Sequence, residues 1–251
     1  MTLGADPEAR SPHDPVPAAP LDVPSAAPPS PAAVHPEKSP LEHPHREPSR
    51  APAYGSSGRA AAADRALTVL GLGGSTRAGS AAERLLRTAL DAAGREGMAT
   101  ELFALAHRDV PVFRESLLLD PPPVVAELLA AVRRADAVVF CTPVYHGTVA
   151  GALKNAVDHL QALAGDDRPW LTGKAAALMA VGGTPLGGAN AITAMDHFCR
   201  SMHATTVPTA VVAGHGSWAP ADLDERVTRM IGELAVHARG LSRAEATPQR
   251  A

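Results

Sequence analysis

A run of small and hydroxyl-bearing residues around one arginine is the segment best suited to bind an anion. It reads Gly71-Leu72-Gly73-Gly74-Ser75-Thr76-Arg77-Ala78-Gly79-Ser80 and leads directly into a predicted helix. Glycines allow the backbone to turn sharply, and the amides of a helix N-terminus point toward a bound anion. The hydroxyls of Ser75 and Ser80 and the fixed charge of Arg77 add further donors. This segment predicts a phosphate site, with a ligand-free glycine and serine turn as the alternative.

The kind of phosphate follows from two glycine-rich motifs that the segment does not complete. The triphosphate motif GxxxxGK[ST] needs a lysine, and the lysines of the chain are Lys38, Lys154 and Lys174. A dinucleotide motif GxGxxG would need glycine at Thr76, and no acidic residue ends the second predicted strand to hold a ribose. A terminal monophosphate suits the hydroxyl-rich segment better, because each of its oxygens needs its own donor.

A second candidate segment follows the third predicted strand and reads CTPVYHGTVAGALKNAVD over residues 141–158. Together with the GSxRxxS pattern of Ser75, Arg77 and Ser80, it resembles the NADPH-dependent FMN reductase family, whose usual pattern is approximately TPxYxxxxPGxLKNxxD. The resemblance covers roughly residues 66–240. One departure is Ala150, which stands where the family has proline and is expected to leave the loop freer.

This resemblance implies a flavodoxin-like protein that binds FMN and uses NADPH or NADH, with the flavin rather than a catalytic side chain carrying the chemistry. A third segment, VGGTPLGGA over residues 181–189, follows the fourth predicted strand. In the proteins it resembles, this segment lies along the pyrimidine side of the flavin, where backbone N–H groups can stabilise negative charge. The cofactor-binding residues carried over are Ser75, Arg77, Ser80, Thr142, Pro143, Val144, Tyr145, His146, Gly147, Gly182 and Gly183.

Other side chains in the second segment have structural interpretations. His146 is expected to be an ordinary loop residue, because hydride transfer to a flavin needs no side-chain acid. Lys154 and Asp158 are four residues apart on a predicted helix and can pair, while Asn155 can brace the preceding loop. Cys141, at a strand end without an adjacent base, is expected to be a buried apolar residue rather than a nucleophile.

The elements that must position these segments alternate along the chain from residue 66. Short apolar runs are separated by amphipathic stretches of helical length, which is typical of βαβ units around a parallel sheet. The predicted strands are residues 67–72, 100–105, 137–141, 175–181 and 206–212; the predicted helices are 80–96, 123–134, 150–163, 189–203 and 221–241. The predicted fold is a three-layer, doubly wound, flavodoxin-like α/β domain with a five-stranded parallel sheet, whose strand ends should bring the three segments together.

The N-terminal part of the chain differs in composition from the rest. Its first 60 residues contain 14 of the 24 prolines and almost no large apolar side chain. Such a stretch cannot bury a core, so residues 1–64 are expected to form a disordered tail. The FMN-binding domain is then predicted over residues 65–242, with a disordered C-terminus at 243–251.

Composition also limits the partners and the location. The formal net charge is −3 without a basic stripe, which argues against nucleic acid or an anionic membrane as a partner. No apolar run approaches the ~18 residues of a membrane span, and the start lacks an export signal, so a cytoplasmic location is expected. The two cysteines form no CxxC pair, which argues against a disulfide framework or a cysteine-based zinc site.

Taken together, the sequence predicts an NAD(P)H-dependent FMN reductase that passes hydride through FMN to a small acceptor such as a free flavin, a quinone, an azo compound or a metal oxyanion. The alternatives are a flavodoxin-like electron carrier for a partner protein and an FMN-dependent dehydrogenase in biosynthesis. A carrier is expected to show a marked acidic face, whereas residues 61–251 carry a net charge of only −1. The large apolar residues Leu117–Leu119, Trp170 and Trp218 lie in predicted loops and, together with the resemblance, predict a homodimer or homotetramer. In this assembly the loops around Leu117 and Trp170 are expected to help cover the flavin of the neighbouring subunit.

Overall fold

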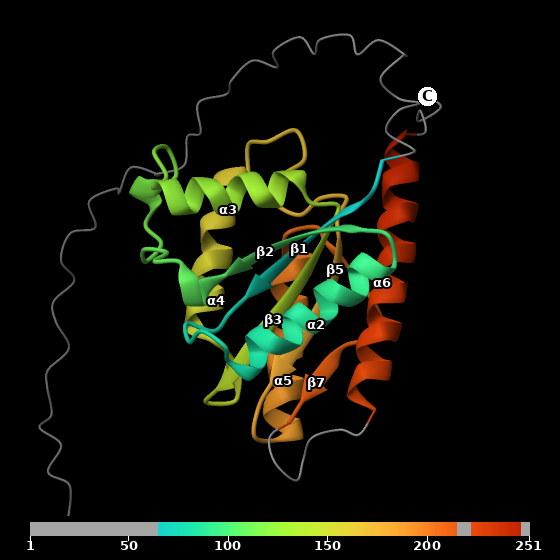
Figure 1. Cartoon of the computed structure of the whole chain (residues 1–251). Helices are drawn as coiled ribbons and strands as arrows, with labels where there is room; N and C mark the ends of the chain where they lie inside the picture. Colours follow the sequence, from blue (N-terminus) through green and yellow to red (C-terminus); the bar gives the residue numbers. More distant parts are fainter. Residues whose placement is uncertain (1–64, 215–221, 247–251) are drawn as a thin grey trace, which may run out of the picture. The chain divides into compact units, whose positions relative to one another are not determined.

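The computed structural model describes residues 65–214 and 222–246 (Figure 1). The predicted tail over residues 1–64, Trp218 and residues 247–251 lie outside the described residues. Among the helices that are described, none is long and apolar enough to cross a membrane.

A parallel sheet forms the centre of the domain, with strands in the order β2-β1-β3-β5-β6. The strands are β1 (Thr68–Gly73), β2 (Ala99–Ala104), β3 (Ala137–Tyr145), β5 (Ala175–Val181), β6 (Thr205–Thr206) and β7 (Val211–Ala213). All of β5 and most of β1 and β3 are buried, as expected for strands covered on both faces.

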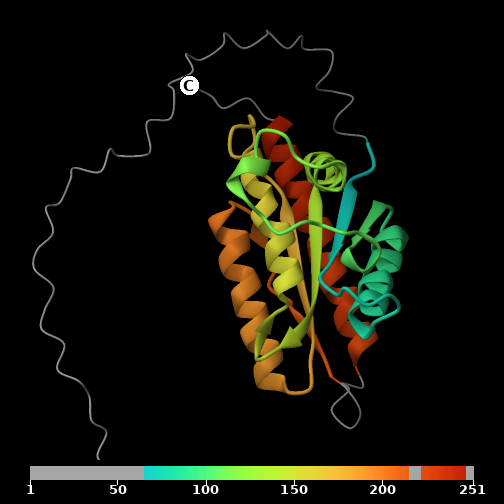
Figure 2. The same ribbon diagram turned by 90° about the vertical axis from the view of Figure 1, so that its left-hand side faces the viewer.

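Helices cover both faces of this sheet (Figures 1 and 2). The first layer contains α2 (Ala81–Arg95) and α6 (Leu223–Ala246). The second contains α3 (Pro123–Arg134), α4 (Gly151–Asp158) and α5 (Pro185–Ser201). Short 3-10 helices lie at Leu105–His107, Glu115–Leu117 and His159–Leu163. Each layer buries its own apolar core against one face of the sheet, so the predicted three-layer, doubly wound fold is confirmed.

The edge of the sheet beside β5 differs from the single strand predicted over residues 206–212. β6 pairs with the first two residues of β5, and β7 pairs with its last three. Pro208 lies between them and has no N–H to donate to a strand neighbour. The carboxylate of Glu233 on α6 instead accepts the amide and the hydroxyl of Thr209, at 2.8 and 2.7 Å. The proline therefore divides the edge strand, and a helix side chain fixes the interruption.

The start of α5 also differs from the prediction, because the helix begins at Pro185 rather than at Ala189. The hydroxyl of Thr184 accepts the amide of Gly187 at 3.2 Å and caps the helix. Proline suits the first helical position, where no backbone donor is needed. The segment after β5 is consequently a shorter turn than predicted.

The ends of two other helices differ as well. α4 stops at Asp158, and the rest of the predicted helix, residues 159–163, is a 3-10 helix. α6 runs to Ala246, five residues past its predicted end. Residues 243–246, which were predicted to be disordered, are therefore helical.

Candidate functional site

Three segments meet at the carboxyl edge of the sheet: residues 74–80 after β1, 146–147 after β3 and 182–184 after β5. β1 lies beside β3, and β3 beside β5, so these strand ends are neighbours in the lower part of Figure 1. The strand order changes direction between β1 and β3, which is where open α/β sheets bind ligands. The structure thus brings the three predicted segments together at such a point.

The segment after β1 is shaped by close contacts with its neighbours. The Gly74 amide donates to the Cys141 carbonyl at 2.8 Å, and a Cβ on Gly74 would lie 2.8 Å from the Cβ of Leu153. Ser75 is buried, and its Oγ accepts the Arg77 amide at 3.2 Å and donates to the Arg77 carbonyl at 3.3 Å. The one hydrogen of the Ser75 hydroxyl is thus donated within the turn that presents Arg77, so the side chain stabilises this turn, and the donor that Ser75 leaves open is its amide.

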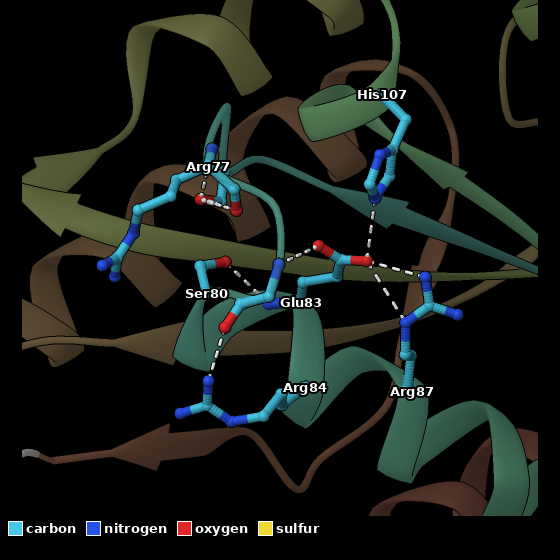
Figure 3. Close-up of polar contacts among 8 residues, drawn as sticks. Arg77, Ser80, Glu83, Arg84, Arg87 and His107 are labelled. Atoms are coloured by element: carbon cyan, nitrogen blue, oxygen red, sulfur yellow. Dashed lines mark hydrogen bonds and ion pairs between the residues drawn. The ribbon is translucent and has the colours of Figure 1, made fainter.

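The same segment leaves several donors open. The amides of Ser75, Thr76 and Ala78 have no acceptor within residues 65–214 and 222–246. The first amides of α2 lack carbonyl partners inside the helix, as at every helix N-terminus. In Figure 3 the exposed Arg77 side chain points away from the hydrogen bonds around Glu83. Its guanidinium has no partner in the described part of the chain. These donors, with the positive end of the helix dipole, form a cradle for an anion.

Ser80 and Glu83 cap the N-terminus of α2 (Figure 3). Ser80 Oγ accepts the Glu83 amide at 3.2 Å, and the Glu83 carboxylate accepts the Gly79 amide at 2.9 Å. Sequence reasoning missed Glu83, although the S-x-x-E spacing is the signal of a capping box. Arg87 Nη2 donates to Glu83 at 2.7 Å, and His107 Nε2 lies 3.2 Å from the same oxygen. The hydrogen bond from Arg87 outweighs desolvation and holds the pKa of Glu83 below its ordinary value.

The segment after β3 is a hairpin rather than a loop. β3 continues four residues past its predicted end at Cys141, so four predicted loop residues lie in a strand: Thr142, Pro143, Val144 and Tyr145. The last two pair antiparallel with β4 (Thr148–Val149). His146 and Gly147 form the turn with φ values of 51° and 80°, as in a type I′ hairpin.

The predicted residues of this hairpin differ in what they can contact. Tyr145 is 56% exposed and His146 is exposed, so both side chains are accessible to a ligand. Thr142 is fully buried, and its hydroxyl donates to the Pro143 carbonyl and accepts the Ala150 amide at 3.0 Å. The Thr142 side chain therefore supports the hairpin from within.

The turn after β5 packs against the hairpin. A Cβ on Gly182 would lie 3.0 Å from Cγ2 of Val144, and one on Gly187 would lie 3.2 Å from its Cγ1. Gly183 is exposed, and an added Cβ there would meet no atom within 4 Å. Gly187 and Gly188, which the sequence placed in a loop, lie in the first turn of α5. An accessible backbone at Gly183 beside the hairpin allows close approach of a flat ligand.

The helix after the hairpin carries the residues that were predicted to be structural. Lys154 and Asp158 form the predicted ion pair. The prediction for Asn155 was wrong in its target, because Asn155 braces the loop after β2 and not the preceding loop. Its Oδ1 accepts the Phe113 amide at 2.8 Å, and its Nδ2 donates to the Pro111 carbonyl at 2.9 Å.

The two cysteines are buried side chains. Cys141 is a buried side chain, as predicted; it donates to the Ala82 carbonyl at 3.2 Å, and burial raises the pKa of its thiol. Cys199 is buried in α5, whereas the nearby His197 is exposed. In the described ranges, no cluster of three or more metal-ligating side chains occurs.

Comparison with known proteins agrees with this geometry. Residues 67–219 match the family of NADPH-dependent FMN reductases. The chain belongs to this family. Against a curated NADPH azoreductase of Bacillus sp. (strain OY1-2), it is 35% identical over 45% of this chain and 60% of that protein. Against an NAD(P)H-dependent FMN reductase of Pseudomonas aeruginosa, it is 38% identical over 37% of this chain and 49% of that protein.

This FMN reductase family member thus matches about half to three-fifths of the length of those relatives. Among solved structures, the flavoenzyme NAD(P)H:(acceptor) oxidoreductase FerB of Paracoccus denitrificans aligns with a TM-score of 0.55. The alignment covers 71% of this chain and 98% of that one at 22% identity, which shows a common fold.

Ala150, the departure from the family pattern, makes a backbone hydrogen bond at the start of α4. Its amide donates to Thr142 Oγ1 at 3.0 Å, a bond that proline could not make. Its φ of −60° is also one that proline would adopt. A hydrogen bond therefore holds the start of α4 where a proline ring would otherwise restrict it.

Proposed function

We propose that this chain is an NAD(P)H-dependent oxidoreductase that holds FMN at the carboxyl edge of its sheet and passes reducing equivalents to a small acceptor. The observation that carries the proposal is the group of open donors between β1 and α2. It lies beside the hairpin after β3 and the glycine turn after β5, so one flat, phosphorylated ligand can contact all three segments.

The residues of the first segment fit a phosphate monoester. The open amides of Ser75, Thr76 and Ala78 and the Arg77 guanidinium offer separate donors to the phosphate oxygens. The Ser80 hydroxyl accepts the Glu83 amide, so its own hydrogen remains available to the ligand. A dianion at this position is also stabilised by the dipole of α2.

The residues of the other two segments fit the flavin ring. Tyr145, His146 and Gly147 border one side, and the backbone of Gly182 and Gly183 borders the other. Their role is to orient the ring and to direct backbone donors at it. Bound there, FMN supplies the redox chemistry, which is hydride acceptance from NADPH or NADH and delivery of electrons to the acceptor.

For the electron acceptor, the proposal names chemical classes rather than one compound. The names of the relatives point to azo compounds, free flavin or quinones, all of which are small molecules that a site open to solvent can admit. Activity in the cytoplasm is part of the proposal, because the cytoplasm supplies reduced nicotinamide cofactors. A homodimer or homotetramer is also part of it, because apolar side chains such as Leu119 are exposed. Cell fractionation and light scattering test these two points.

The proposal is tested by an anaerobic titration of the FMN-loaded protein with NADPH and with NADH. Loss of the oxidised flavin absorbance, followed by its return on adding a quinone, supports an oxidoreductase. A protein that binds FMN but is reduced by neither nucleotide would instead be an electron carrier. Equal affinity for FMN and riboflavin would contradict the phosphate site.

A further inference from the structure

We propose that Glu83 is a positioning residue for the phosphate of FMN. Its carboxylate fixes the Gly79 peptide, so that the open amides and Arg77 of segment 74–80 stay directed at the anion. This inference rests on the proposed function, because it takes FMN as the ligand of that segment. Glu83 lies outside the GSxRxxS pattern and outside the hairpin, so neither motif assigns it a role.

Both backbone polar groups of Gly79, its N–H and its carbonyl, are held by side chains of α2. Its N–H donates to Glu83 Oε2 at 2.9 Å, and its carbonyl accepts Arg84 Nη1. Gly79 has a φ of +63°, a conformation that other residues rarely adopt. It lies between Ala78, whose amide is open, and the Ser80 cap. Loss of the carboxylate would free the Gly79 amide and let the turn relax.

Glu83 is itself held by groups from two elements. From α2, Arg87 donates to Oε1 through Nη2 at 2.7 Å and through Nε at 3.2 Å. From the 3-10 helix after β2, His107 Nε2 lies 3.2 Å from the same oxygen. The Glu83 side chain is only 5% exposed. With contacts on both oxygens, the carboxylate ties segment 74–80 to the body of the domain.

The negative charge of Glu83 makes the positioning role testable, because positioning and simple charge repulsion predict opposite changes in phosphate affinity when the carboxylate is removed. A carboxylate near an anion site repels the anion, so its removal would by Coulomb's law strengthen phosphate binding. Arg77, Arg84 and Arg87 lie around it in Figure 3, which keeps the site attractive to an anion. A positioning role predicts the opposite result, namely weaker phosphate binding once the carboxylate is gone.

The test compares FMN and riboflavin affinities in Glu83→Ala, Glu83→Gln and wild-type protein, measured by flavin fluorescence. The ratio of the riboflavin Kd to the FMN Kd isolates the contribution of the phosphate. Asp91→Asn is the matched control, because Asp91 is an exposed carboxylate on the same helix, about two turns away. Glu83→Gln has nearly the same shape and keeps the comparison possible if Glu83→Ala does not fold.

We expect the ratio to fall by about tenfold or more in Glu83→Ala, as for a lost hydrogen bond to a charged group. A smaller fall is expected in Glu83→Gln, which keeps one acceptor oxygen, and none in Asp91→Asn. If the ratio is high in the wild-type protein and equally high or higher in both Glu83 variants, the positioning role alone is overturned. A wild-type ratio near one would overturn the phosphate site, and with it both the inference and the proposed function.

Amide hydrogen exchange of the flavin-free proteins gives a second measurement that needs no activity. Exchange of the hydrogen-bonded amides of Arg77, Gly79 and Ser80 should accelerate in both Glu83 variants and stay unchanged in Asp91→Asn. Equal exchange in wild-type and Glu83 variants would show that the carboxylate does not hold the segment, and would overturn the inference.

Discussion

Arg77 is the side chain on which phosphate affinity should depend most directly. It is exposed, and within the described ranges its guanidinium has no partner to release when an anion binds. Arg84 and Arg87 already donate to Gly79 and Glu83. Arg77 can therefore give its full set of charged hydrogen bonds to the ligand.

Replacing Arg77 with alanine should weaken FMN binding by about 1.5–3 kcal/mol, the range for a hydrogen bond to a charged group. Fluorescence titration of FMN measures the change. Arg95→Ala removes the same charge at the far end of α2 and should leave the affinity unchanged. An Arg77→Ala protein with wild-type affinity would place this guanidinium outside the phosphate site.

The residues of the segment after β1 were predictable to different degrees. Ser75, Arg77 and Ser80 follow a glycine-rich strand end and precede a helix, and the structure places all three in one turn. Glu83 could have been found from the S-x-x-E spacing alone. Its contact with His107 joins residues 24 positions apart, and no local pattern reveals such a contact.

At the scale of elements, the buried strands were predictable because a sheet covered on both faces needs continuous apolar runs. β1 and β5 therefore lie within one residue of their predicted positions, and β3 begins at its predicted residue, Ala137. The end of β3 was missed, because its last residues pair with β4, a contact that propensity does not encode. The single edge strand predicted over residues 206–212 was wrong for a local reason, since Pro208 divides this segment between β6 and β7.

Close packing between α5 and β7 depends on one glycine. A Cβ on Gly188 would lie 2.1 Å from Cγ1 of Val212 and 3.2 Å from both its Cβ and its Cγ2. Rotation of the valine cannot clear all three atoms, so the helix or the strand would have to shift. Gly232 in α6 is the contrasting case, because an added Cβ there would meet no atom within 4 Å.

Gly188→Ala should therefore lower the free energy of unfolding by about 1–3 kcal/mol, as for an overpacked core. Gly232→Ala should raise it by about 0.5–1 kcal/mol, because alanine is the better residue inside a helix. Urea denaturation of both variants measures the difference. A Gly188→Ala protein as stable as wild type would show that α5 and β7 can separate without cost.

At the scale of the whole molecule, the described domain accounts for the predicted chemistry without the first 60 residues. All three segments of the candidate site and both apolar cores lie within residues 65–246. Deleting residues 1–60 should leave thermal stability and FMN affinity essentially unchanged, since that stretch has almost no core-forming side chains. Calorimetry and flavin titration of the truncated protein check this, and loss of folded, flavin-binding protein would contradict it.

The apolar side chains that were expected to mark a subunit contact differ in their exposure. Leu119 is 97% exposed, whereas Trp170 is half-buried, with its ring 5.2 Å from that of His203. Trp170 precedes β5 at the amino edge of the sheet, opposite the candidate site. It lines a groove of about 310 Å³ between α4 and α5, together with Phe113, Phe198 and Met202. A flavin near Trp170 would therefore have to belong to a neighbouring subunit.

A homodimer or homotetramer that covers this groove remains our prediction, and Trp170→Ala should weaken subunit association and NAD(P)H oxidation in parallel. The reason is that Trp170 would pack at the subunit contact, and the same contact would complete the flavin site of the neighbouring subunit. Light scattering measures the association, and the decay of nucleotide absorbance measures the oxidation. Val236→Ala removes an exposed apolar side chain on α6, in the other layer, and should change neither. If the wild-type protein is a monomer with full activity, Trp170 acts only within its own subunit, where it packs against His203.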